Sequence, residues 1–182
     1  MASYGGKELA AAFRTVRGNT LTIAEDIPAA QYDFRPAPDV RPVDKLLVHM
    51  ALSPSFALHI HGNKIADLET VNFMELMQKL GAEEAKPLKK DEILTFLKSE
   101  GYKYASFLEG LSDSFLAETV TQAPGMEPAV KTRFEMLLSP KEHEMHHRGQ
   151  LMLIERMIGI TPHLTREFQA RMAAQAAQQP RA

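Results

Sequence analysis

Two histidines near the end of the chain have the spacing of metal ligands on a helix. His143 and His147 are four residues apart in the segment that runs from His143 to Gln150. On an α-helix this spacing places two side chains about 40° apart on one face, one turn from each other. Two imidazoles in a dry interior pair poorly with each other unless a cation lies between them. The pair therefore indicates a metal site.

A third histidine, His49, lies far upstream inside the apolar stretch 46–51. One helix face cannot surround an ion, so metal sites in helical bundles draw their ligands from facing helices. Three neutral imidazoles with an open fourth position form a familiar catalytic arrangement. The chain has no cysteine, so a metal site must use His, Asp or Glu. We therefore predict that His49, His143 and His147 bind one divalent metal ion.

Other roles for the histidines stay open at this point. A single histidine on an apolar helix face is usually a hydrogen-bonded core residue. His146 is also a near neighbour of His143 on a helix, so it could replace His147 as a ligand, or it could face solvent or a partner subunit. His59 and His61 lie near a predicted helix end, where surface or capping histidines are common.

The same segment also matches the His-Glu-x-x-His motif of metalloproteases, in which Glu144 would be the general base. That interpretation needs a third ligand downstream, for which the candidates are Glu155, Glu167 and His163. The extended motif with a later glycine and histidine is absent, because Gly149 comes one residue too early. Since so short a pattern arises easily in a histidine-rich segment, protease-like hydrolysis is the minor alternative.

Two side chains of this segment are candidates for a catalytic role. Gln150 lies on the predicted histidine face, one turn beyond His146 and His147, and could hydrogen-bond a bound water molecule or substrate. Glu144 points roughly 100° away from His143, so it is a candidate base only if the helix presents a wide face to the site. The sequence shows no clear second catalytic group, so a non-catalytic metal-binding stress or interaction module is the alternative to an enzyme.

Hydrophobic periodicity predicts the helices that position these residues. The predicted helices upstream of the histidine segment cover residues 7–25, 43–62, 71–80 and 91–116. The second is expected to kink at Pro54, which has no N–H to donate. The third is a short helix in a crossover, and Gly81 is expected to end it.

The histidine-bearing helix has two possible beginnings. The sequence 139–142 (Ser-Pro-Lys-Glu) is typical of a fresh helix start. The alternative is one longer helix from about Lys131 with a kink at Pro140. In both cases Gly159 ends it. Its predicted core face carries His143, His147, Gln150, Ile154 and Met157. A short helix over 164–174 follows, and the Ala- and Gln-rich residues 175–182 are expected to fray.

Four main helices with long crossovers and no clear strand predict an all-α four-helix bundle with a short extra helix in a crossover. The length of 182 residues suits one domain, 1–182. A net charge of −2 without a basic stripe argues against nucleic acid as a partner. We expect a soluble cytoplasmic protein, since the sequence has neither a membrane-spanning stretch nor a signal peptide.

Two segments give the chain a resemblance to the DinB-like superfamily, which includes the YfiT-type proteins. The stretch Leu46–Ala51, after Phe34-Arg35-Pro36, is similar to the family's second helix with its ligand histidine. The segment His143–Gln150 resembles the family's fourth-helix pattern of His, three residues, His, then Arg-Gly-Gln. Chain length and helix spacing agree with the family over nearly the whole sequence.

The resemblance implies an up-down-down-up four-helix bundle, often dimeric. It implies a nickel, zinc or similar ion held by His49, His143 and His147, with water completing the shell. An open position on the metal could activate a water molecule for hydrolysis or bind a thiolate directly. The resemblance implies the second course, a metal-dependent transferase of a small molecule that uses a thiol such as bacillithiol or mycothiol as co-substrate. The methionines in the crossover, Met74 and Met77, could form an adaptable homodimer interface.

Overall fold

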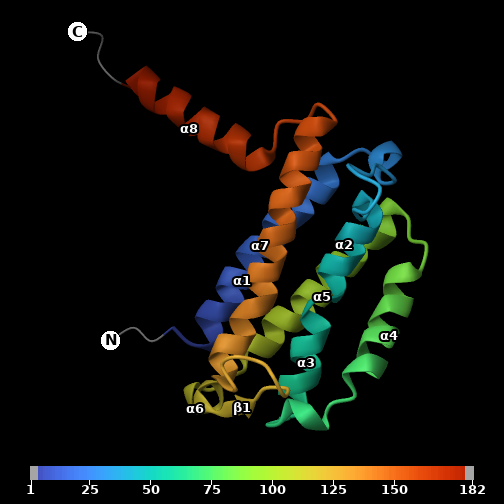
Figure 1. Ribbon diagram of the computed structural model, residues 1–182. Coiled ribbons are helices and arrows are strands. Elements are labelled where there is room, and N and C mark those ends of the chain that lie inside the picture. The colour runs from blue at the N-terminus through green and yellow to red at the C-terminus, as the bar shows by residue number, and fades with distance from the viewer. Residues whose placement is uncertain (1–3, 179–182) are drawn as a thin grey trace.

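Four helical segments run along one long axis in the part of the chain that the structure describes, residues 4–178. They are α1 (Gly6–Asp26), α2 (Val43–Leu52) continued by α3 (Pro54–Gly62), α5 (Lys90–Glu109) and α7 (Arg133–Met157). In this computed structural model, followed from its blue end in Figure 1, α1 runs up, α2 and α3 run down, α5 runs down and α7 runs up. The predicted four-helix bundle and its up-down-down-up order are confirmed.

The first helix, α1, buries one apolar face along its whole length. Leu9, Phe13, Val16 and Ile23 recur at intervals of three, four or seven residues and are all buried. This face packs against α5 and α7, and α2 packs against the same two helices from the other side. Packing of amphipathic faces, rather than helix propensity, supplies most of the stability of helices in proteins. The hydrophobic period therefore predicts this part of the fold well.

The smaller elements lie mainly at the ends of the bundle or beside it. They are the 3-10 helices η1 (Ala29–Gln31) and η2 (Leu68–Thr70), the helices α4 (Phe73–Ala85), α6 (Asp113–Ala117) and α8 (His163–Gln178), and the strands β1 (Thr119–Thr121) and β2 (Val130–Thr132). The strands pair antiparallel, with Val120 opposite Lys131. The sequence shows no clear strand because three residues are too few to form an alternating pattern. The predicted helix 91–116 is likewise two helices, separated at Gly110.

Pro54 divides the second bundle segment into α2 and α3, as its missing N–H predicts. Without that N–H, the carbonyl of Met50 has no helical partner four residues ahead. Two side chains satisfy it instead. The hydroxyl of Ser53 donates to it at 3.1 Å, and Nη2 of Arg17 donates to it at 3.0 Å.

Arg17 is a buried cation that joins all four bundle segments. From α1 it bonds to the carbonyl of Met50 on α2 and to the carbonyl of Leu97 on α5. Its Nε and Nη2 each donate to one carboxylate oxygen of Glu144 on α7, both at 2.8 Å. A Cβ on Gly101 would lie 2.8 Å from Arg17 Cγ, so the Arg17 side chain packs closely against α5 at this glycine.

Helix α7 is one long helix, so the second of the two predicted beginnings is confirmed. Thr132 caps it, with Glu135 completing a capping box, and Pro140 lies inside it. The predicted core face was wrong in part, because Gln150 and Met157 are exposed while Ile154 is buried. The buried face instead carries Leu137, Pro140, Glu144, Leu151, Ile154 and Glu155. His143 and His147 are half-buried at the edge of this face.

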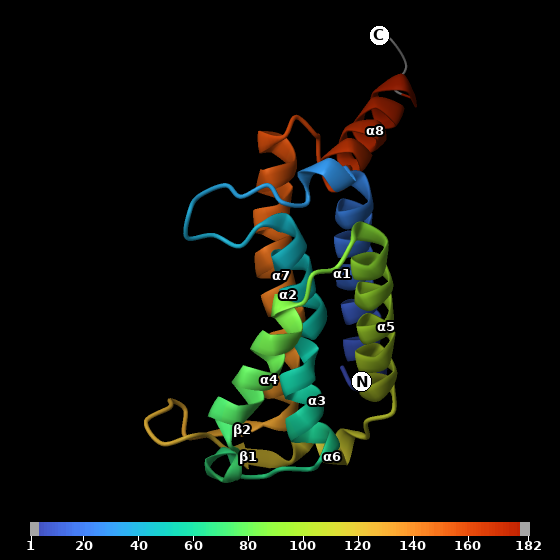
Figure 2. The same cartoon turned by 90° about the vertical axis from the view of Figure 1, so that its right-hand side faces the viewer.

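Helix α4 is the extra helix in the crossover, and it is longer than predicted. It begins after Asn72, which caps the N–H of Glu75, and continues through Gly81 to Ala85, just before Pro87. None of its residues is buried, and Figure 2 shows it beside α2 and α3 on the outside of the bundle. The prediction that Gly81 ends it was wrong.

Helix α8 leaves the bundle after Gly159, whose φ of +85° ends α7 as predicted. Figure 1 shows α8 pointing away from the other helices. It extends to Gln178, so 175–178 of the predicted frayed tail are helical, and 179–182 lie outside the described residues. None of the helices in the described range combines the length and hydropathy needed to cross a membrane.

Candidate metal centre

The structure brings together the three histidines predicted to bind a metal. His49 comes from α2, and His143 and His147 come from adjacent turns of α7. One ring nitrogen of each lies within 4.8 Å of the other two. Nε2 of His143 is 3.2 Å from Nε2 of His49 and 3.2 Å from Nε2 of His147. His146 is exposed and outside this group, and its Nε2 lies 3.3 Å from the amide nitrogen of Gln150.

Hydrogen bonds at Nδ1 of His49 and of His147 determine which nitrogen of each ring carries the proton. Nδ1 of His49 is 3.0 Å from a carboxylate oxygen of Glu84, which can only accept. Nδ1 of His147 is 2.7 Å from Oε1 of Gln150. Each Nδ1 is therefore the donor. In the neutral rings, the Nε2 atoms of His49 and His147 present lone pairs toward His143.

Converging lone pairs suit a cation. A proton on Nε2 of His143 could satisfy only one of its two neighbours, which would leave the other lone pair without a donor. Two nitrogens bound to one ion at about 2.0–2.1 Å, at a tetrahedral angle, lie about 3.3 Å apart. The two separations of 3.2 Å agree with this value. The three residues therefore fit the donor set of a divalent metal ion.

The electrostatics of the site keep two of the imidazoles in the form that binds metal. Burial, with the neighbouring histidines and Arg41 adding to it, lowers the pKa of His143 from 6.5 to about 4. Burial also lowers the pKa of His147, and its hydrogen bond to Gln150 only partly offsets this. Both rings are therefore neutral at pH 7, and neutral imidazole is the ligand form.

Glu84 on α4 is a site residue that the sequence analysis missed. Burial alone would raise the pKa of its carboxyl group, but hydrogen bonds from Arg41 and His49 outweigh burial and lower it. Arg41 Nε donates to the second carboxylate oxygen at 2.5 Å. The ammonium group of Lys45 donates to the three carbonyls at the end of α4, those of residues 84–86. These contacts hold the end of α4 against the metal-site helix α2.

The sequence contains a better marker for the end of α4 than Gly81. Because Gly81 was interpreted as a helix end, the residues after it were assigned to a loop. Pro87 marks the boundary better, since the residue before a proline is disfavoured in a helix. Even with the right boundary, only the packing of α4 on α2 places Glu84 next to His49.

Glu144 and Gln150, the two candidate catalytic residues, lie in different surroundings. The Glu144 carboxylate is fully buried, and both of its oxygens accept hydrogen bonds from Arg17. Gln150 is exposed and orients His147. Within the described residues, the cluster of possible metal ligands is His49, His143 and His147. Glu155, His163 and Glu167 do not belong to it, so the structure does not support the protease-like ligand set.

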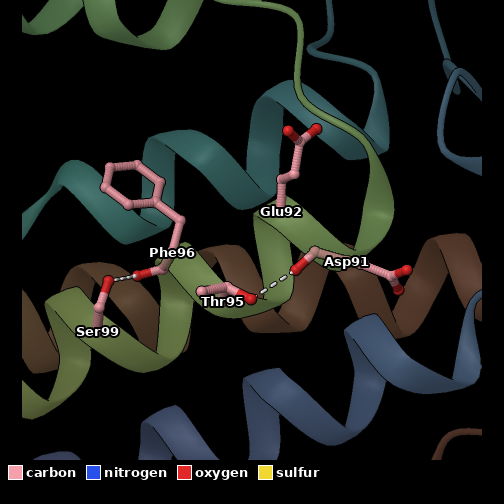
Figure 3. A pocket seen from close by; sticks show the side chains of 5 residues that line it. All are labelled: Asp91, Glu92, Thr95, Phe96 and Ser99. Atoms are coloured by element: carbon pink, nitrogen blue, oxygen red, sulfur yellow. Dashed lines mark hydrogen bonds between the residues drawn. The ribbon is translucent and has the colours of Figure 1, made fainter.

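A cavity of about 770 Å³ opens beside the three histidines and is lined by His49 and His143. It extends between α3, α4, the loop after β1 and the first half of α7. A second hollow of about 390 Å³ lies on α5, where Figure 3 shows Asp91, Glu92, Thr95, Phe96 and Ser99. There the hydroxyls of Thr95 and Ser99 bond to carbonyls of their own helix. The cavity beside the histidines is therefore the candidate substrate site.

The Glu84→Ala variant should bind a divalent ion about 10- to 100-fold more weakly than the wild type, which is the usual cost of losing a residue that orients a ligand. The physical reason is that the His49 ring would lose the partner that fixes its Nδ1 proton. Competition with a fluorescent chelator measures the affinity. Glu83→Ala is the matched control, since Glu83 is exposed and pairs with Lys86. Equal affinities for all three proteins would contradict the role of Glu84.

Comparison with known proteins finds similar folds. Two solved structures from Bacillus subtilis are similar to the chain. The DinB-like protein YjoA is 21% identical, with 85% of this chain and 93% of that chain covered and a TM-score of 0.63. YfiT, described as "a probable metal-dependent hydrolase with an unusual four-helix bundle topology", is 13% identical, with 88% and 91% covered and a TM-score of 0.66.

An uncharacterised protein from Clostridium difficile 630 is also similar, at 12% identity, with 87% of this chain and 99% of that chain covered and a TM-score of 0.66. No curated protein sequence matches the chain. The family model of the DinB superfamily matches residues 12–151, which include all three clustered histidines. The chain therefore belongs to the DinB superfamily.

Proposed function

We propose that this protein is a metal-dependent hydrolase of a small-molecule substrate. In this proposal His49, His143 and His147 hold one divalent ion, with nickel and zinc the best candidates for three imidazole ligands. The observation that carries the proposal is the convergence of three Nε2 atoms, with His49 and His143 also lining a large cavity. The description of the similar protein YfiT as a probable metal-dependent hydrolase supports the same reaction class.

Each part of the site then has a chemical task. A divalent ion with an open coordination position supplies a Lewis acid that lowers the pKa of a water molecule toward neutrality. Glu84 and Gln150 hold His49 and His147 with their Nε2 lone pairs toward that position. The cavity binds the substrate and removes it from bulk water, which strengthens electrostatic interactions at the reacting group. Glu144 does no proton transfer in this scheme, because Arg17 occupies both of its oxygens.

Transfer of a thiol to an electrophile is the second candidate. The same open position can bind a thiolate, as the family resemblance implies for bacillithiol or mycothiol. The chain has no cysteine of its own, so the attacking thiol would have to be a co-substrate. This candidate and hydrolysis share the ligand set and differ only in the nucleophile.

Two assays on metal-loaded and metal-stripped protein distinguish the candidates. Hydrolysis of p-nitrophenyl acetate and p-nitrophenyl hexanoate should be fast only with nickel or zinc bound, and should fall to the buffer rate in His143→Ala. Thioether formation between bacillithiol and monochlorobimane, followed by fluorescence, reports thiol transfer. Activity in the second assay alone would replace hydrolysis by thiol transfer. Bound metal without turnover in either assay would favour a non-catalytic metal-binding module.

We also propose that the protein is a homodimer. Phe168 and Met172 on the projecting helix α8 are 59% and 49% exposed, and Met74 on α4 is 68% exposed. Exposed apolar side chains of this size are common at interfaces between subunits. Light scattering at micromolar concentration should give twice the chain mass, and the Phe168→Glu variant should shift it toward the monomer. A monomer mass for the wild type would rule the dimer out.

A further inference from the structure

The cavity beside the metal site has a mostly apolar lining that the three histidines do not explain. Phe56 lies on α3, Val71 precedes α4, Met77 and Leu80 lie on α4, Met126 lies in the loop after β1, and Met136 lies on α7. A volume of about 770 Å³ is within the range of small-molecule sites. Methionine side chains adapt to ligands of varied shape. The lining therefore favours a substrate with a largely apolar body.

One polar group of the lining has a fixed hydrogen-bonding role. His61 lines the cavity at the end of α3, and its side chain is nearly fully buried. Its Nδ1 is 3.2 Å from Nη1 of Arg133. A guanidinium can only donate, so Nδ1 is the acceptor and carries no proton. Burial, with Arg133 adding to it, lowers the pKa of His61 to about 4, so the ring is neutral and its proton lies on Nε2.

Arg133 is itself held firmly, so the tautomer of His61 is held as well. Its Nε pairs with Glu118 at 2.9 Å, and Nη1 also donates to the carbonyl of Ile65 at 3.0 Å. Among the described residues, Nε2 of His61 has no hydrogen-bond partner of its own. Nδ1 is bonded to Arg133, which does not line the cavity, so Nε2–H is the remaining polar group of this ring.

We propose that His61 is a specificity-determining residue: its Nε2–H donates a hydrogen bond to a neutral acceptor oxygen on the apolar body of the ligand, away from the metal-binding histidines. Taking this ligand as the substrate rests on the proposed function. A neutral acceptor suits the site better than an anion, because Glu135 and Glu142 line the cavity beside Lys131. The ligand class is thus an apolar molecule with a ketone, ester, amide or ether oxygen set into its body.

The probe for the test is prodan, a neutral naphthalene with one ketone oxygen, added to metal-stripped wild type. Its fluorescence rises in an apolar site and shifts to the red when the ketone accepts a hydrogen bond. Dimethylaminonaphthalene, the same body without the ketone, is the reference ligand. We expect one prodan molecule to bind per chain, with emission further to the red than in the variant that lacks the donor.

Two substitutions at position 61 separate its two nitrogens. His61→Asn keeps an acceptor near Nδ1 for Arg133 but removes the donor at Nε2. It should weaken prodan binding about fivefold, which is the usual net value of one hydrogen bond, and shift its emission to the blue. It should leave the binding of dimethylaminonaphthalene unchanged. His61→Gln retains a donor near the Nε2 position and should keep the red-shifted emission. Equal prodan affinity and emission in the wild type and His61→Asn would overturn the proposal.

A pair of methionines on α4 tests where the probe binds. Met77 lines the cavity, whereas Met74, one turn earlier, is 68% exposed and does not. Met77→Trp should block both probes, and Met74→Trp should block neither. If Met77→Trp left binding unchanged, the cavity would not be the ligand site. Because these measurements use metal-stripped protein, they can fail while the metal proposal holds, and the metal-content experiments can fail while these succeed.

Discussion

The His143→Ala variant should bind a divalent ion roughly 100-fold more weakly than the wild type, and protein purified from it should carry almost no metal. Structural zinc sites bind with about 10–16 kcal/mol over four ligands, or about 3 kcal/mol for each ligand. His143 lies between the other two histidines, with an Nε2–Nε2 distance of 3.2 Å to each. Elemental analysis and chelator competition measure the loss.

The control for this prediction is the neighbouring histidine. His146→Ala removes an exposed ring outside the cluster, so its metal content should match that of the wild type. His147→Ala and His49→Ala should each behave like His143→Ala. Equal metal loss in all four variants, or no metal in any preparation, would contradict the assignment of the three histidines as ligands.

His49 adds a thermodynamic check, because it joins α2 to α7. Metal at 100 times its dissociation constant stabilises the folded protein by about 2.7 kcal/mol if the unfolded chain does not bind it. The rise in melting temperature on metal addition should therefore be clear in the wild type and much smaller in His49→Ala, which should still fold without metal.

Glu144→Ala should lower the free energy of unfolding by about 3–5 kcal/mol, the largest effect that we expect of any single substitution on stability. The carboxylate and the Arg17 guanidinium are both almost completely excluded from water, at 0% and 4% exposure. Removing one partner leaves the other as an uncompensated buried charge. Urea unfolding of the metal-free protein, followed by circular dichroism, measures the change.

Two controls separate burial from pairing. Arg14 and Glu109 form the same kind of pair between α1 and α5, but both side chains are nearly half exposed, so Arg14→Ala should lower the free energy of unfolding far less than Glu144→Ala. The double variant Arg17→Met, Glu144→Leu removes both charges together and should be much more stable than Glu144→Ala alone. If Glu144→Ala cost no more than Arg14→Ala, the buried pair would contribute little to the fold.

The bundle and the histidine cluster could be predicted from the sequence because both follow local spacing. The interval of four between His143 and His147 fixes their relation on any helix. The apolar period around His49 places it on a helix that faces the same region. The predicted kink at Pro54 also followed from a single residue with distinctive stereochemistry.

Features that depend on packing between distant segments could not be predicted in this way. The role of Glu84 depends on α4 lying against α2, and no local pattern near residue 84 encodes that contact. The buried face of α7 was misjudged because the most buried position beside the histidines is a charged residue, Glu144. Only its partner Arg17, 127 residues earlier, makes that burial favourable.

The break at Pro54 leaves a backbone carbonyl in the bundle interior free to accept a hydrogen bond from a buried charged side chain. In a regular helix every carbonyl before the C-terminal turn accepts a hydrogen bond from a backbone N–H of the same helix. The interior of a helical bundle therefore has few free oxygens to replace water around a guanidinium. Because Pro54 has no N–H, the carbonyl of Met50 is free, and Arg17 donates a hydrogen bond to it in place of one to water. Met50 directly follows His49, and Glu144 directly follows His143. Met50 and Glu144, together with the Leu97 carbonyl on α5, thus replace the hydration shell that Arg17 loses on folding. The contacts that stabilise this buried charge therefore also join the two helices that present the histidines.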